Sequence, residues 1–238
     1  MALDFGALDE ALRMAELLRP SGVRFKIGLE LFCRHGPDGV ARMQERTGPV
    51  LLDLKLHDIP HTVGQAVRSL APLGVWGLTL HAGGGPVMLR AAVDAAAQAP
   101  APVRCLAVTV LTSLDEQVLH VLGVRTPLAQ QVAALATLAR AAGCAGVVAS
   151  PQEVRTVRGA AGPDCLVVTP GVRPRGAAAA DQARVATPAE ALGAGADHLV
   201  VGRPITGARD PRAALEAILE ELVAGAPRGR EGALGPEA

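Results

Sequence analysis

Lysine is scarce in this chain of 238 residues. Only two of its 23 basic residues are lysines, Lys26 and Lys55, and the others are arginines. An arginine guanidinium is effectively never deprotonated, whereas a lysine ammonium is a compact charge that can transfer its proton. Both lysines fall near the ends of predicted strands, so we interpret them as candidates for a task that arginine cannot perform.

Three further absences narrow the class of protein. The four cysteines, at positions 33, 105, 144 and 165, form no CxxC pair, which favours reduced cytosolic thiols over a disulfide framework or a zinc site. The formal net charge is zero, so neither nucleic acid nor an anionic membrane is an expected partner. No run of about 18 uncharged apolar residues occurs, and Asp4 interrupts any signal-peptide core. We therefore expect a cytoplasmic protein.

One segment, LLDLKLHDIP at residues 51–60, combines a hydrophobic layer with a set of charges. Because alternate side chains of a strand share a face, one face is expected to carry Leu52, Leu54 and Leu56. The other face is expected to carry Asp53, Lys55 and His57. Asp58 follows where Ile59 and Pro60 end the strand, because proline has no N–H for a ladder. Charges on a strand are costly unless paired or used, so this face is either a solvated edge or a functional site.

Strand-like and helical patterns alternate along the whole chain. The candidate strands lie at residues 2–5, 23–27, 49–56, 75–80, 103–111, 146–149, 165–169 and 198–201. Such alternation implies parallel strands with crossover helices, and about eight units in a chain of this length predict a (β/α)8 TIM barrel of the α/β class. We expect one catalytic domain over residues 1–224 and a disordered tail at 225–238, which is rich in Gly, Pro and charge. A doubly wound open sheet is the alternative, but no GxGxxG follows the first strand.

Polar residues fall at the C-terminal ends of these strands, where barrels of this kind place their catalytic groups. They are Asp4, Lys26, Asp53, Lys55, His81, Thr112, Arg173 and Arg203. Each alone could be a loop residue satisfied by local hydrogen bonds. Together they indicate an active site.

The end of the last strand carries a pattern typical of phosphate binding. Residues 200–204, VVGRP, run from a strand through Gly202 into a short helix that begins at Arg203. Glycine lets the backbone approach a ligand, N–H groups at a helix start favour an anion, and arginine is a bidentate partner. The preceding loop, 174–184, is rich in Ala and Gly and carries Arg175 and Gln182. It is interpreted as a mobile lid or as a poorly ordered loop.

These motifs resemble the orotidine 5′-monophosphate decarboxylase family. The resemblance rests on LDF at 3–5, KIGLELF at 26–32, DLKLHDIP at 53–60, HAGG at 81–84, TVLTS at 109–113, TPGVR at 169–173, DQARVATP at 181–188 and VGR at 201–203. It implies a carbon–carbon lyase that converts orotidine 5′-monophosphate to UMP and CO2 in pyrimidine biosynthesis. It also implies a homodimer with shared active sites and no metal or cofactor. Two departures from the family pattern are the very short segment before Asp4 and the Ala-rich run at 177–180.

The resemblance also implies a role for each matched residue. Lys55 would protonate C6 of the pyrimidine after CO2 leaves, Asp53 would lie beside the departing carboxylate, and Asp58 would reach into the partner's site. The substrate-binding residues would be Asp4, Lys26, Asp53, Ile59, Thr62, Thr112, Arg173, Gln182, Gly202 and Arg203. Among these, Asp4 and Lys26 would contact the ribose and Thr112 the pyrimidine. The residues from Arg173 onward would hold the phosphate and the lid.

Two other functions fit parts of the pattern. A Mg2+-dependent sugar-phosphate decarboxylase or aldolase of the same barrel superfamily would share the Asp-x-Lys-x-x-Asp strand. Such relatives place a metal-binding Glu about where this chain has Lys26, which disfavours a metal here. A non-catalytic barrel that binds a phosphate-bearing ligand would bind a nucleotide without turnover.

Overall fold

The structure is a computed structural model, and it describes residues 1–174 and 186–225. Within these residues the strands pair in parallel in chain order, as β1 (Ala2–Leu3), β2 (Lys26–Ile27), β3 (Leu51–Leu56), β4 (Gly77–His81), β5 (Arg104–Val108), β6 (Gly146–Val148), β7 (Leu166–Thr169) and β8 (His198–Leu199). The amide of Ala2 donates to the carbonyl of Val201 at 2.7 Å and so joins the two ends of the sheet. The predicted (β/α)8 barrel is confirmed, and the open-sheet alternative is wrong.

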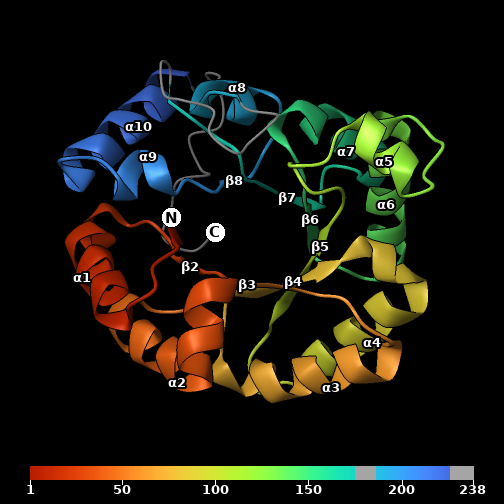
Figure 1. Cartoon of the computed structure of the whole chain (residues 1–238), viewed down its shortest axis with the longest axis horizontal. Coiled ribbons are helices and arrows are strands. Elements are labelled where there is room, and N and C mark those ends of the chain that lie inside the picture. The colour runs from red at the N-terminus through yellow and green to blue at the C-terminus, as the bar shows by residue number, and fades with distance from the viewer. Residues whose placement is uncertain (175–185, 226–238) are drawn as a thin grey trace.

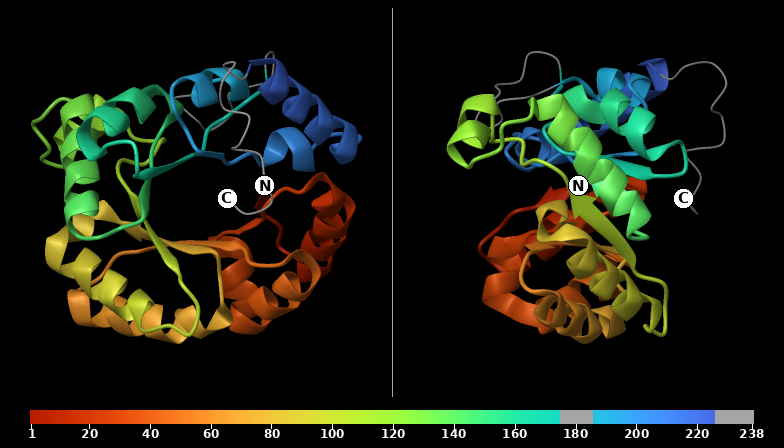
Figure 2. Two further views of the ribbon diagram at one scale, coloured as in Figure 1. Left: turned by 180° about the vertical axis from the view of Figure 1, so that it is seen from behind. Right: turned by 90° about the vertical axis from the view of Figure 1, so that its right-hand side faces the viewer.

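Helices cover the outside of the strands (Figures 1 and 2). They are α1 (Leu8–Leu18), α2 (Leu29–Thr47), α3 (Pro60–Leu70), α4 (Gly85–Ala97), α5 (Glu116–Val121), α6 (Leu128–Ala141), α7 (Val154–Ala161), α8 (Pro188–Gly193), α9 (Arg203–Thr206) and α10 (Pro211–Gly225). Short 3-10 turns lie at Arg19–Ser21, Ala71–Leu73, Ala82–Gly84 and Pro151–Glu153. None of the helices within the described ranges is long and apolar enough to cross a membrane. The expected tail lies outside the described residues from position 226 onward.

Two hydrophobic layers stabilise the barrel. The larger one lies between strands and helices and includes Leu52 and Leu54, as the alternation in β3 predicts. The smaller one fills the barrel interior and includes Leu51, Trp76 and Leu106. Because side chains on a strand alternate, the residue that starts β3 points inward and its neighbour points outward. Leu51 and Val168 of this inner layer also line the polar pocket at the C-terminal ends of the strands.

Strand β3 departs from regular geometry exactly where its charges lie, and this corrects one prediction. Leu52 pairs with Leu78 of β4, and Leu56 pairs with Leu80. Between these two pairs β3 therefore contains two more residues than β4, which is a β-bulge. Lys55 lies in this bulge with φ of 51°, a left-handed conformation that is strained for a residue with a Cβ. His57 was expected beside Asp53 and Lys55, but it lies past the strand end and is exposed. Alternation cannot be extrapolated through a bulge.

The four cysteines are all free, and only the Cys33 side chain is exposed. Burial raises the pKa of Cys105 and Cys144 to about 12, and burial also raises the pKa of Cys165. We expect a thiol reagent to modify Cys33 in the native protein and the other three only after denaturation, because the thiolate is the reactive form. Mass spectrometry of the labelled protein measures this. Native labelling of two or more sites would contradict the described packing.

Candidate active site

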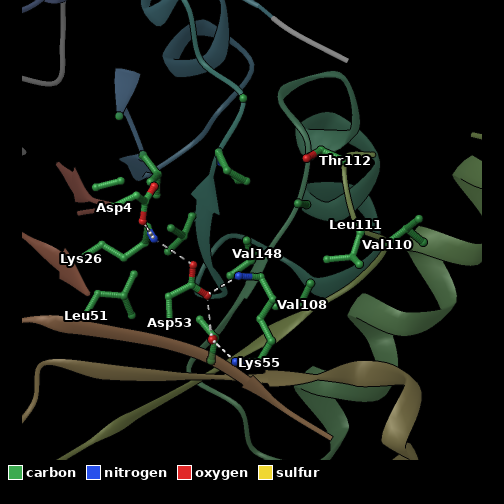
Figure 3. Close-up of a pocket in the computed structure, with 18 of the residues that line it drawn as sticks. Asp4, Lys26, Leu51, Asp53, Lys55, Val108, Val110, Leu111, Thr112 and Val148 are labelled. Atoms are coloured by element: carbon green, nitrogen blue, oxygen red, sulfur yellow. Dashed lines mark hydrogen bonds and ion pairs between the residues drawn. The ribbon is translucent and has the colours of Figure 1, made fainter. Parts of the chain in front are cut away.

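A pocket opens at the C-terminal ends of the strands (Figure 3). Its lining includes most of the residues that the sequence predicts for the site, Asp4, Lys26, Asp53, Lys55, Thr112, Arg173, Gly202 and Arg203. These residues come from the ends of β1, β2, β3, β7 and β8 and from the segment after β5. The barrel therefore gathers side chains that are far apart in the sequence into one cavity.

Four of these side chains form a chain of alternating charge. The Nζ atom of Lys26 lies 3.2 Å from Asp4 Oδ1 and 3.3 Å from Asp53 Oδ2. The Nζ atom of Lys55 lies 2.8 Å from Asp53 Oδ1. Figure 3 shows the order Asp4, Lys26, Asp53, Lys55 along one wall of the pocket. Each ammonium has a carboxylate neighbour, which offsets the cost of removing these charges from water.

Asp53 lies in the middle of this row of charged side chains, between Lys26 and Lys55, and is largely buried in the pocket. Burial raises the pKa of Asp53, but the charges of Lys26 and Lys55 and hydrogen bonds from Lys55 and Thr79 outweigh burial. The net result is a pKa below the ordinary value of an aspartate. Asp53 is therefore ionised at neutral pH and holds Lys55 by both charge and hydrogen bond.

Thr79 of β4 supports this arrangement, and sequence reasoning missed it. Its Oγ1 donates to Asp53 Oδ1 at 2.9 Å and accepts the backbone N–H of Lys55 at 2.9 Å. The Thr79 residue is only 1% exposed. It therefore fixes both the carboxylate and the strained backbone next to it. The available signal was a hydroxyl at an inward position of the otherwise apolar strand GLTL.

Gly28 leaves room for two of the charged groups, Asp4 and Lys26. A Cβ added at Gly28 would lie 2.9 Å from Asp4 Oδ1 and 3.2 Å from Lys26 Nζ. A side chain at position 28 would therefore push the Asp4 carboxylate, the far end of an exposed side chain, away from its place beside Lys26. The position lies in the KIGLELF motif, although the sequence argument gave this glycine no role.

His81 ends β4, and its ring lies 5.4 Å from that of His57. Burial first, and then the nearby charges of His57 and Lys55, lower the pKa of His81. Neither histidine lines the pocket. The structure therefore does not place His81 in the lining of the described cavity: the histidine packs at the edge of the charged cluster and remains neutral at pH 7.

The pocket also has an apolar wall and further polar residues. The apolar wall consists of Val108, Val110, Leu111, Val148 and Val168. The further polar residues are Arg173 after β7 and Gly202 and Arg203 after β8. Arg173 is 8% exposed, and its Nη1 donates to the carbonyl of Val172 at 3.2 Å. Two guanidinium groups in the lining of one cavity suit a doubly charged oxyanion.

The remaining predicted site residues are not gathered into this cavity. Asp58, Ile59 and Thr62 are exposed and do not line the pocket. The Oδ1 atom of Asp58 accepts the backbone N–H of Ile59 at 2.6 Å, which holds the turn before α3. Gln182 lies outside the described residues, as does Arg175.

Among the described residues, the acidic ones that line this cavity are Asp4 and Asp53, and they do not form a metal-binding group. Across residues 1–174 and 186–225, the His, Cys, Asp and Glu side chains form no group of three or more that could hold a metal ion. Each oxygen of Asp53 lies within 3.3 Å of an ammonium nitrogen. The donor positions around this carboxylate are thus taken by the two lysines.

Comparison with known proteins identifies the family. The sequence model described as the orotidine 5′-phosphate decarboxylase / HUMPS family matches residues 1–218. The chain belongs to this family. Its match covers every residue of the described pocket and extends into α10.

Individual members of the orotidine 5′-phosphate decarboxylase / HUMPS family match the chain nearly end to end. The orotidine 5′-phosphate decarboxylase of Anaeromyxobacter dehalogenans is 54% identical over 221 residues, which are 93% of this chain and 96% of that protein. The one of Moorella thermoacetica is 51% identical over 229 residues, 93% of this chain and 90% of that protein. The crystal structure of orotidine 5′-phosphate decarboxylase from Lactobacillus acidophilus superposes with a TM-score of 0.81 at 40% identity and covers 93% of this chain and 96% of that chain.

Proposed function

We propose that this protein decarboxylates orotidine 5′-monophosphate to UMP and CO2 in de novo pyrimidine biosynthesis. The observation that carries the proposal is the pair of Lys55 and Asp53, 2.8 Å apart, in a pocket that Arg203 also lines. The two relatives compared above, which are 51% and 54% identical to this chain, are named orotidine 5′-phosphate decarboxylase. The reaction class is a carbon–carbon lyase.

Lys55 is the proposed general acid. Loss of CO2 leaves an electron pair on C6 of the pyrimidine, and the ring offers no electron sink for it. The Lys55 ammonium gives its proton to C6 and so forms the new C–H bond, after which the amine regains a proton from water. An ammonium near that carbon contributes about 4 kcal/mol at an effective dielectric near 20, or roughly a thousandfold in rate.

The remainder of the rate enhancement is assigned to preorganisation and remote binding energy. Asp53 and Thr79 hold Lys55 before substrate arrives, so little reorganisation accompanies the reaction. Arg173, Gly202 and Arg203 are proposed to bind the phosphate, together with Gln182. Binding energy at this group accelerates the reaction where it is realised more fully in the transition state. Asp4 and Lys26 are proposed to contact the ribose, and Thr112 the pyrimidine.

A direct assay tests the proposed activity. The purified protein is mixed with orotidine 5′-monophosphate in the presence of EDTA, and the fall in substrate absorbance is followed. We expect full turnover whether or not the chelator is present. Loss of activity with EDTA and its recovery with Mg2+ would favour the metal-dependent alternative. Tight UMP binding without turnover would favour a non-catalytic barrel.

We also propose that the protein acts as a cytoplasmic homodimer in which Asp58 reaches the partner's active site. The segment from Asp58 to Thr62 is exposed in the single chain, and Ile59 is 65% exposed although it is apolar. Asp58 does not line the pocket of its own chain, so a role for it at an active site requires a second chain. Four free thiols support a reducing compartment.

Thr79→Val should separate the role of the hydroxyl from that of the threonine shape. The two hydrogen bonds of the Thr79 hydroxyl are made to Asp53 and to the backbone of Lys55. We therefore expect kcat/KM to fall about tenfold, which corresponds to a rise of about 1.4 kcal/mol in the activation free energy. Loss of a donor to the ionised carboxylate also raises the pKa of Asp53, so the acidic limb of the pH–rate profile moves to higher pH. Thr79→Ser keeps the hydroxyl and should retain most activity. Equal losses in both variants would contradict the hydrogen-bond argument.

A further inference from the structure

The end of the barrel opposite the pocket carries a cluster of basic and aromatic side chains, Arg24, Trp76, Arg104 and His198. Each precedes or begins a strand, so all lie at the N-terminal ends of the parallel strands. The Arg24 and Arg104 guanidinium carbons lie 5.0 Å and 5.2 Å from the Trp76 ring centroid. The His198 ring meets the Trp76 ring edge to face at 5.0 Å.

The inner apolar layer of the barrel, to which Trp76 belongs, separates this cluster from the active site. Its side chain is buried and packs with Leu51, Leu106 and Val168 in the inner layer of the barrel. Leu51 and Val168 of the same layer also line the catalytic pocket from the other side. A ligand of the basic cluster would therefore lie at a second site, with one layer of apolar side chains between it and the first.

The positive charge of the cluster is not balanced by the protein around it. Within the described ranges, no carboxylate lies within 4.0 Å of Arg24 or Arg104. Asp197, next to His198, is engaged elsewhere: its Oδ2 accepts from Arg158 Nη2 and from the Val167 amide. Burial and the charge of Arg104 lower the pKa of Arg24. Two guanidinium groups thus lie against one indole ring with no carboxylate within 4.0 Å among the described residues, and they repel each other.

Two buried donors of the cluster also have no acceptor. Arg24 Nη1 and Trp76 Nε1 are inaccessible to solvent and have no hydrogen-bond partner in the part of the chain that the structure describes. Buried N–H groups are nearly always paired, so each of these marks a place where an acceptor is expected. The cluster therefore combines positive charge with unused donors, and both features require the same kind of partner.

We propose that Arg24, Trp76 and Arg104 form a binding site for a small oxyanion of the phosphate or sulfate class at the N-terminal end of the barrel. Guanidinium groups match the geometry of such anions, and the indole N–H adds a neutral donor. An anion that binds the native state alone stabilises it in proportion to the logarithm of its concentration. The site acts on stability and is separate from catalysis.

The fluorescence of Trp76 offers a direct readout, because the chain contains one tryptophan and no tyrosine. The full-length protein is titrated with inorganic phosphate while sodium chloride keeps the ionic strength constant. We expect a saturable change in Trp76 emission and a parallel rise in Tm. Arg104→Gln should weaken the apparent affinity at least tenfold while decarboxylase activity stays unchanged. Arg203→Ala, at the other end of the barrel, should keep the fluorescence response.

Each alternative gives a distinct result. A response that disappears in Arg203→Ala but persists in Arg104→Gln would mean that phosphate binds the catalytic pocket alone and would overturn the proposal. A change that does not saturate, or that sodium chloride reproduces, would mean that these donors are satisfied by water and would also overturn it. If Arg104→Gln does not fold, Arg104→Lys keeps the charge but not the bidentate fork. The proposal then requires weaker phosphate binding by the lysine variant, and equal affinity would refute it.

Discussion

Lys55→Ala is expected to lower kcat/KM for orotidine 5′-monophosphate by at least about a thousandfold. The substitution removes the ammonium that is held 2.8 Å from Asp53 and, with it, the proposed source of the proton for C6. It also leaves the Asp53 charge with Lys26 as its remaining cationic neighbour. Steady-state kinetics measure the loss, and calorimetric titration with UMP measures whether the pocket still forms.

Two further variants make this result interpretable. Lys55→Arg keeps a positive charge but has no readily transferred proton, so we expect it to remain severely impaired. Arg212→Ala removes a cation from an exposed pair with Glu216 on α10 and should leave kcat/KM within about twofold, as surface substitutions generally do. Undiminished turnover by Lys55→Ala would exclude Lys55 as the general acid. Near-normal turnover by Lys55→Arg would mean that Lys55 contributes its positive charge and is not the proton donor.

The sequence predicts the barrel and most of the pocket for physical reasons that are visible in particular residues. Parallel strands bring their C-terminal ends together, so Lys26, Asp53 and Arg203 line one pocket although they are far apart in the chain. The leucines of β3 alternate with its charges, which separates the helix-facing side from the pocket side. Strand lengths were overestimated, as in β2, because apolar residues continue beyond the paired ones.

What the sequence could not supply depends on local geometry. The bulge in β3 gives Lys55 a left-handed backbone and takes His57 out of the pocket, and simple alternation contains no sign of either. The role of Thr79 depends on its register with β3, which is only known once the strands are paired. Trp76 and Arg104 likewise become neighbours only when the barrel closes.

Mixing two inactive variants should restore activity if the active sites are shared between subunits. If Asp58 reaches the partner's reacting centre as proposed, Asp58→Asn alone is expected to lower kcat/KM by about a hundredfold or more, because a charge at that centre is lost. Asp58 does not line the pocket of its own chain, so the proposal assigns this loss to the partner's site. When Lys55→Ala and Asp58→Asn chains are refolded together, each mixed dimer has one site with both defects and one intact site. Random pairing therefore recovers about one quarter of wild-type activity.

A second mixture provides the matched control. Lys55→Ala and Asp53→Ala affect residues that line the same pocket of one chain, so their mixed dimers contain no intact site and should remain inactive. Recovery in the first mixture alone would place Asp58 across the interface from Lys55. No recovery in either mixture, with mixed dimers verified by native mass spectrometry, would exclude the shared site.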